Sequence, residues 1–292
     1  MKMAKTMEVE KPNAKTAYET ITVTQLSPNV GAEIGNIDLT KPLTPIQVKE
    51  VRAAITAHGV IFFREQPISF EDHDRFVRYF GEPHEHIGGD YGASKRIPDF
   101  PGIREQYFDG NSKRVAGEDW HSDQSYGDKP PTFSILHQEK VPTNGGGDTM
   151  FMSCSKAYDE LSDTMKDYLR GKTVTHMGGK SFDPEGAGKR PEMVHPAVTL
   201  HPESGRKVLF VNPSFTSHIN GVPKAESKAV LQYLYEHMRK PHWHMRFHWR
   251  DHSIAMWDNR AVQHMAIWDY WPQVRLGYRM FVQNNDAPAM AD

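Results

Sequence analysis

The chain has 292 residues and an almost balanced charge, with 35 Lys and Arg against 37 Asp and Glu. This balance gives no general attraction to nucleic acid or to an anionic membrane, so we expect neither as a partner. The hydrophobic fraction of 38% supplies enough apolar material for a sizeable core. No apolar stretch is long enough to cross a bilayer, and the single cysteine, Cys154, favours a reducing, cytoplasmic location.

The N-terminal half combines short strands with two helices that carry clear start and stop signals. Thr44 as N-cap and Pro45 as the first helical residue begin a helix that ends before Gly59. Ser69 caps a second helix, which is predicted to run to residue 80. The other predictions for this half are a flexible tail at 1–20, strands at 21–24, 32–37 and 60–63, and a long loop at 84–118.

From Trp120 onward the pattern becomes rich in strands. Residues 177–193 are rich in Gly and Pro, and like the segment 84–118 they predict a lid over a pocket or a surface insertion. The chain shows no internal repeat, so residues 21–285 are predicted to form one mainly β domain with peripheral helices, followed by a C-terminal tail at 286–292. The predicted elements of this half are strands at 132–138, 196–200, 207–212, 243–249, 253–258 and 275–282, and helices at 155–169 and 225–238.

Three residues are candidate metal ligands. His121 and Asp123 form a His-x-Asp motif, and on a strand two residues at this spacing point to the same face. The motif alone is weak evidence, because about one chance occurrence is expected in a chain with this many histidines. His264 supplies a second imidazole, far along the chain. Two histidines and one carboxylate leave three coordination positions open, which suits an Fe(II) ion that must hold a chelating cosubstrate and O2; zinc prefers a tetrahedral set.

Two arginines follow His264 at a spacing that extends this interpretation. Arg275 and Arg279 share a face if residues 275–282 form a strand. A guanidinium there can pair with a carboxylate through two parallel hydrogen bonds, and 2-oxoglutarate has such a carboxylate at its far end. The combination of His-x-Asp, a distant histidine and two spaced arginines is much less expected by chance than any one of them.

With these residues in place, the chain resembles the taurine dioxygenase family of Fe(II)- and 2-oxoglutarate-dependent oxygenases over residues 23–282. The resemblance rests on a set of short motifs that stand in the family's order. They are Gly31-Ala32-Glu33-Ile34, Asp38-Leu39-Thr40, Phe80-Gly81-Glu82, Trp120-His121-Ser122-Asp123, Gly146-Gly147-Asp148-Thr149, Leu209-Phe210-Val211-Asn212 and Trp257-Asp258-Asn259-Arg260.

The resemblance implies a double-stranded β-helix (jelly-roll) core and a role for each candidate residue. His121, Asp123 and His264 match the catalytic iron ligands, and Thr149 and Arg275 match the residues that hold 2-oxoglutarate. The matches to substrate-binding positions are His86, Phe182, Phe215 and Arg279. A departure lies at Gly89 and Gly117, where the taurine enzyme has a Tyr and an Asn near the substrate amine, and this puts taurine in doubt as the substrate.

The resemblance therefore predicts a dioxygenase that hydroxylates a small anionic substrate and releases succinate and CO2. Sulfonates, sulfate esters and carboxylates such as aryloxyalkanoates are the expected substrates, and the oligomeric state stays open. Two alternatives remain at this stage. One is a cupin-like metal binder or a zinc hydrolase on a similar barrel, which needs no 2-oxoglutarate. The other is a non-catalytic β-sandwich binding module with incidental histidines, which predicts neither metal nor succinate.

Overall fold

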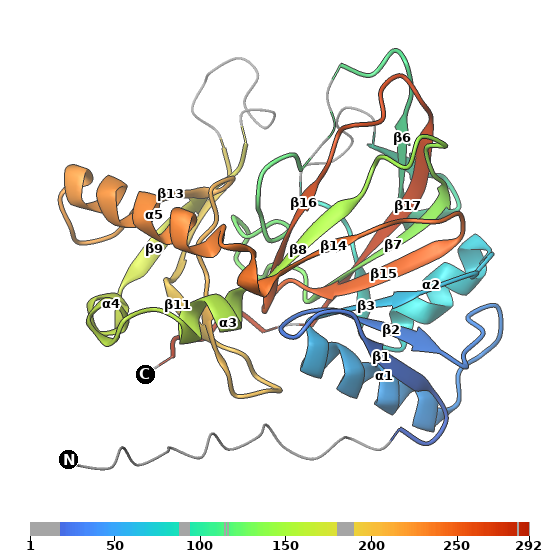
Figure 1. Ribbon diagram of the computed structural model, residues 1–292, viewed down its shortest axis with the longest axis horizontal. Helices are drawn as coiled ribbons and strands as arrows, with labels where there is room; N and C mark the ends of the chain where they lie inside the picture. The colour runs from blue at the N-terminus through green and yellow to red at the C-terminus, as the bar shows by residue number, and fades with distance from the viewer. Residues whose placement is uncertain are drawn as a thin grey trace, which may run out of the picture.

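The computed structural model describes residues 18–87, 94–113, 115, 117–179, 190–284 and 286–291. The predicted tail at 1–20 lies almost wholly outside these residues. Two facing β-sheets form the centre of the molecule, with two helices on the outer face of the larger sheet and a second lobe of helices and short strands beside them (Figure 1). This arrangement is the predicted jelly-roll core, mainly β with few helices.

The main sheet contains nine strands among the described residues, and all neighbours are antiparallel except β2 and β3. Its central strands β15, β7 and β17 are flanked on both sides by strands from the N-terminal part of the chain, residues 22–108. In spatial order the strands are β1 (Thr22–Gln25), β2 (Ala32–Gly35), β3 (Val60–Phe63), β15 (Ser253–Asp258), β7 (Phe133–Lys140), β17 (Arg275–Gln283), β6 (Phe100–Phe108) and β5 (Ser94–Ile97), with β4 (Glu82–His84) pairing with β17.

The smaller sheet faces the main one and closes the jelly roll. Its strands are β14 (His244–Phe247), β8 (Thr149–Ser153) and β16 (Val262–Ala266). An apolar core fills the space between the sheets, and Phe62 of β3 stacks on Phe247 of β14 with ring centroids 3.7 Å apart. Phe151 of β8 and Trp257 of β15 belong to the same core. Residues on β7, β8, β16 and β17 can therefore face one another across the barrel.

Helices α1 (Pro45–His58) and α2 (Phe70–Arg78) cover the outer face of the main sheet. Both begin at the predicted caps, because the side chains of Thr44 and Ser69 each accept a hydrogen bond from the third residue of the helix. The first helix ends at Gly59, whose φ of 73° is in the region that glycine tolerates best.

The second lobe packs its own apolar cluster beside the barrel. The predicted helix at 155–169 was wrong as a single element, because Ser162 caps a new helix after a break. The lobe consists of α3 (Cys154–Asp159), α4 (Asp163–Leu169), α5 (Lys224–Met238), the 3-10 turn η2 (Pro241–Trp243), β9 (Thr173–Met177), β10 (Glu192–Pro196), β11 (Val198–Leu200), β12 (Lys207–Leu209) and β13 (Thr216–Ile219).

The prediction of a long loop at 84–118 was also wrong, because this segment contains β5 and β6. Pro101 and Gly102 of β6 disfavour a strand, but they stand at its start, outside the part that pairs with β17 from Arg104 onward, where such residues are tolerated. Of the predicted lid at 177–193, residues 180–189 lie outside the described part, and β10 begins at Glu192. Among the described residues no helix is both long and apolar enough to span a membrane.

Candidate active site

The three predicted metal ligands converge inside the barrel. One ligand atom from each of His121, Asp123 and His264 can be chosen so that all lie within 4.8 Å of one another. The two histidines are brought together by an isolated β-bridge, in which the backbone N–H of each donates to the carbonyl of the other at 3.1 and 2.9 Å. This bridge explains how residues so far apart in the sequence meet at one point.

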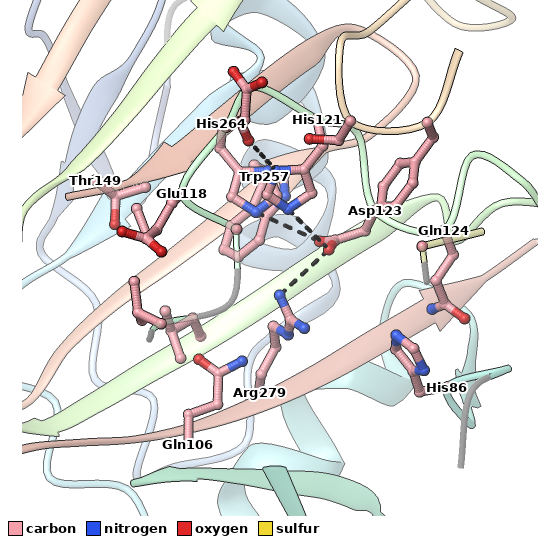
Figure 2. Close-up of a pocket in the computed structure, with 18 of the residues that line it drawn as sticks. His86, Gln106, Glu118, His121, Asp123, Gln124, Thr149, Trp257, His264 and Arg279 are labelled. Atoms are coloured by element: carbon pink, nitrogen blue, oxygen red, sulfur yellow. Dashed lines mark hydrogen bonds and ion pairs between the residues drawn. The ribbon is translucent and has the colours of Figure 1, made fainter. Parts of the chain in front are cut away.

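The His-x-Asp motif does not lie on a regular strand, as the spacing argument had assumed. After the bridge at His121 the chain enters a turn, and Gln124 has a φ of 51°. The imidazole and the carboxylate nevertheless point to the same place, with His121 Nε2 3.8 Å from Asp123 Oδ1 and His264 Nε2 3.8 Å from Asp123 Oδ2. Figure 2 shows both rings directed at the Asp123 carboxylate.

The protonation states of this cluster suit a cation. Burial lowers the pKa of His121 and of His264, so both rings are neutral near pH 7. Burial alone would raise the pKa of Asp123, but the charge of Arg279 and its other neighbours hold it well below the usual range. The Nδ1 atom of His121 lies 2.8 Å from the Asp119 carbonyl, which leaves Nε2 facing Asp123. Two neutral imidazoles and one carboxylate are a donor set that fits a divalent iron ion.

A cavity of about 260 Å³ opens beside these ligands, between the two sheets. Strand β17 contributes both predicted arginines to it, so the expectation that Arg275 and Arg279 share a face is confirmed. The cavity is also lined by His86, Gln106, Gln124, Leu136, Thr149, Phe215 and Trp249.

Arg275 is a buried cation that forms no ion pair with a carboxylate in the described part of the chain; of these carboxylates only Asp148 attracts it, from a greater distance. The residue is 4% exposed. Burial lowers the pKa of Arg275, which reflects the cost of holding this charge away from water. Trp249 donates to the hydroxyl oxygen of Thr149 at 3.0 Å, which leaves the Thr149 proton available to a second acceptor. These two side chains fit a carboxylate ligand that enters the same cavity.

The opposite end of the cavity also carries positive charge. Arg279 Nη1 lies 3.3 Å from Asp123 Oδ1, and Figure 2 shows His86 on the same side of the pocket. Burial and then the Arg279 charge lower the pKa of His86 to about 3, so its ring is neutral and can offer one N–H donor. Phe215 packs edge-on to His121 with ring centroids 6.0 Å apart. Phe182 and Gly89 lie outside the described residues.

Gly117 leaves no room for a longer side chain. Its φ is 82°, and a Cβ there would meet His121 Cε1 at 2.8 Å. An Asn side chain at this position would therefore require the His121 imidazole to move. The close packing of Gly117 against His121, a candidate metal ligand, therefore excludes the longer residue that the taurine enzyme has at this position.

Sequence reasoning missed the residues that hold Asp123. Ser134 of β7 donates to Asp123 Oδ2 at 2.7 Å, and Asn259 accepts from the Asp123 backbone N–H at 3.2 Å. Asn259 stands in the motif Trp257-Asp258-Asn259-Arg260, so the motif marked its position without its role. Nothing in the pattern around Ser134 distinguishes it from any other polar residue of a strand.

Comparison with known proteins adds independent evidence. The sequence model described as Taurine catabolism dioxygenase TauD, TfdA family matches residues 22–281. An alpha-ketoglutarate-dependent sulfonate dioxygenase of Saccharomyces cerevisiae is 31% identical over 88% of this chain, which spans 65% of that protein, less than two thirds of its length. An alpha-ketoglutarate-dependent 2,4-dichlorophenoxyacetate dioxygenase of Cupriavidus pinatubonensis is 31% identical over 82% of this chain and 89% of its own length.

A solved structure agrees with the sequence comparisons. The crystal structure of a taurine dioxygenase from Burkholderia xenovorans superposes with a TM-score of 0.81 and 34% sequence identity. The match covers 92% of this chain and 93% of that one. The likeness therefore includes both sheets and the second lobe.

Proposed function

The chain belongs to the Taurine catabolism dioxygenase TauD, TfdA family and is a 2-oxoglutarate-dependent dioxygenase that uses Fe(II) and O2; we propose that it hydroxylates a small anionic organic substrate. The substrate class comprises sulfonates, sulfate esters and carboxylates such as aryloxyalkanoates. In this proposal His121, Asp123 and His264 hold the iron, and the products beside the oxidised substrate are succinate and CO2.

The observation that carries the proposal is Arg275, which is buried in the same cavity as the three ligands and has no ion pair among the described residues. A buried guanidinium without a partner is costly, and a bound carboxylate would relieve that cost with charge-assisted hydrogen bonds. Arg275 and Thr149 would hold the distal carboxylate of 2-oxoglutarate, with its other end directed at the metal ligands. Bound together, Fe(II) and 2-oxoglutarate would supply the electrons that activate O2, which is the oxidant.

The prime substrate would be held at the other end of the cavity. Arg279 and His86 bind its anionic group, one through charge and the other through a neutral N–H donor. Phe215 lines the apolar part. This anchor determines which C–H bond faces the metal, because the anionic group fixes the position of the carbons next to it. The protein contributes placement and the exclusion of water.

The substrate amine of taurine finds no partner at Gly117, where a longer side chain would displace His121. This favours substrates without an amine, such as simple alkyl sulfonates, alkyl sulfates and aryloxyacetates. The yeast and Cupriavidus relatives, named for sulfonate and 2,4-dichlorophenoxyacetate dioxygenation, support the same range.

The test is succinate formation from 2-oxoglutarate with Fe(II) and air, measured on a panel of taurine, pentanesulfonate, hexyl sulfate and 2,4-dichlorophenoxyacetate. We expect at least one amine-free anion to stimulate succinate release more than taurine. Arg279→Ala should raise the KM for that anion and leave the KM for 2-oxoglutarate little changed. Activity with Zn(II) in the absence of 2-oxoglutarate, or unchanged substrate dependence in Arg279→Ala, would contradict the proposal.

A further inference from the structure

Two buried residues that are not metal ligands fix the orientation of the Asp123 carboxylate. Ser134 Oγ donates to Asp123 Oδ2 at 2.7 Å and accepts from Asn259 Nδ2 at 2.8 Å. Asn259 Oδ1 accepts from the backbone N–H of Asp123 at 3.2 Å. The three residues thus form a closed ring of hydrogen bonds that holds both the backbone and the side chain of Asp123.

The directions of these hydrogen bonds are determined by the donors around Asn259. Its Oδ1 also accepts from Trp257 Nε1 at 3.1 Å, so two donors converge on this atom and the amide can have only one orientation. The NH2 group must then face Ser134. Because Ser134 Oγ accepts that N–H, its own proton is directed to Asp123 Oδ2.

Burial makes this arrangement strong. Ser134 is 0% exposed and Asn259 is 2% exposed, so neither hydrogen bond competes with water. The backbone N–H of Asn259 is bound to the Thr132 carbonyl at 3.0 Å, which fixes the turn after β15 to the start of β7. The residues that hold Asp123 are therefore anchored on rigid elements of the main sheet.

We propose that Ser134 and Asn259 are positioning residues that orient Asp123 for the metal. Ser134 occupies one carboxylate oxygen, Oδ2. The other oxygen, Oδ1, lies 3.8 Å from His121 Nε2 and accepts one longer hydrogen bond, from Arg279 Nη1 at 3.3 Å, so it keeps a lone pair for the ion. Partners of this kind, which hold a ligand without touching the metal, contribute strongly to metal affinity. This inference rests on the proposed metal centre.

The experiment measures Mn(II) affinity of the full chain by the loss of the free-ion electron paramagnetic resonance signal. Mn(II) accepts the same nitrogen and oxygen ligands as Fe(II) and is stable in air. Ser134→Ala should weaken Mn(II) binding about tenfold to a hundredfold. Ser134→Thr keeps the hydroxyl and should restore most of the affinity. The thiol of Ser134→Cys is a weaker hydrogen-bond donor of similar shape, so the Mn(II) affinity of this variant should lie between those of Ser134→Ala and Ser134→Thr.

A matched control separates positioning from a general loss of stability. Ser227 of α5 is 3% exposed and accepts a hydrogen bond from Ile219 N at 2.8 Å, in the second lobe. Ser227→Ala removes a buried hydroxyl in the same way and should leave the Mn(II) affinity unchanged, whatever its effect on the melting temperature. Equal loss in the two alanine variants, or unchanged or tighter binding in Ser134→Ala, would overturn the inference.

The two proposals fail differently in this experiment. If the wild-type chain binds Mn(II), and His264→Ala abolishes that binding, the metal centre stands and the Ser134 series tests only the positioning role. If the wild-type chain does not bind Mn(II) at all, both the proposed metal centre and the role of Ser134 are overturned.

Discussion

Arg275 shows how a single residue can serve function at the expense of stability. It is buried beside Trp249, with its guanidinium carbon 5.8 Å from the ring centroid, and has no carboxylate partner among the described residues. A structural arginine in such a place would be paired, because an unpaired buried charge costs several kcal/mol. The charge is retained, we argue, because the cosubstrate supplies the missing anion.

Replacing Arg275 with Leu should therefore separate stability from binding. The apoprotein should become more stable, by about 1 kcal/mol or more, because an unpaired buried charge is exchanged for an apolar side chain of similar bulk. The affinity for 2-oxoglutarate should fall by about a hundredfold, through the loss of two charge-assisted hydrogen bonds. Urea unfolding and equilibrium binding measure the two effects. A destabilised variant that still binds 2-oxoglutarate normally would show that Arg275 is structural.

At the scale of elements, the turn before β8 determines where Arg275 can lie. Gly147 has a φ of 81°, and a Cβ there would meet Arg275 Cδ at 3.2 Å and Arg275 Nε at 3.3 Å. The absence of a side chain thus lets the guanidinium approach the backbone next to Thr149. The motif Gly146-Gly147-Asp148-Thr149 combines this close approach with a cosubstrate residue in one short segment.

Gly147→Ala should displace Arg275 and weaken 2-oxoglutarate binding by about tenfold or more, because small misplacements of binding groups are costly. Gly205→Ala is the matched control. Gly205 also has a positive φ, 67°, but a Cβ there would meet nothing within 4 Å. The Gly205→Ala variant should have the same kind of backbone strain as Gly147→Ala but should keep the wild-type affinity for 2-oxoglutarate. If both variants bind 2-oxoglutarate equally well, the close approach of Arg275 has no functional importance.

Local signals predicted the elements whose ends are fixed by side chains. The helix from Pro45 and the strand at residues 60–63 were predicted to within a residue, since Thr44 and Gly59 mark boundaries by their own chemistry. The strand β6 was not predicted, because Pro101, Gly102 and charged residues interrupt its strand-forming aromatic and Ile residues, and its partner β17 is distant in the sequence.

The sequence predicted those residues of the candidate site whose side chains can bind a metal ion or an anion directly. His121, Asp123, His264 and Arg275 are chemically distinctive, and the structure brings all four to one cavity. Ser134 was not predictable, because its role depends on a hydrogen bond to a residue on another segment. Long-range pairing of this kind leaves no periodic pattern in the sequence.

At the scale of the whole molecule, the buried histidines make stability depend on pH. Burial lowers the pKa of His73 and of His176 to about 3, and that of His137 to about 4, from an ordinary value of 6.5. Below pH 6.5 the unfolded chain binds protons that the folded chain cannot accept. Stability is therefore fully present above that pH and is lost as the pH falls toward the folded-state values.

The free energy of unfolding should thus fall between pH 7 and pH 5, with each such histidine contributing about 1.4 kcal/mol per pH unit below 6.5. Urea unfolding at several pH values measures the slope. His73→Leu should reduce it, whereas His218→Gln, a change at an exposed ring of β13, should not. An unchanged slope in His73→Leu would show that His73 does not contribute.

The central claim is that His121, Asp123 and His264 hold one Fe(II) ion in the cavity where Arg275 receives 2-oxoglutarate. An anaerobic spectrophotometric titration of the full chain with Fe(II) and 2-oxoglutarate tests it most directly. We predict a visible charge-transfer band that needs both additions, is absent in His264→Ala, and requires far more 2-oxoglutarate in Arg275→Leu. The same absorbance in His264→Ala, or no band at saturating Fe(II) and 2-oxoglutarate in the wild-type chain, would contradict the claim.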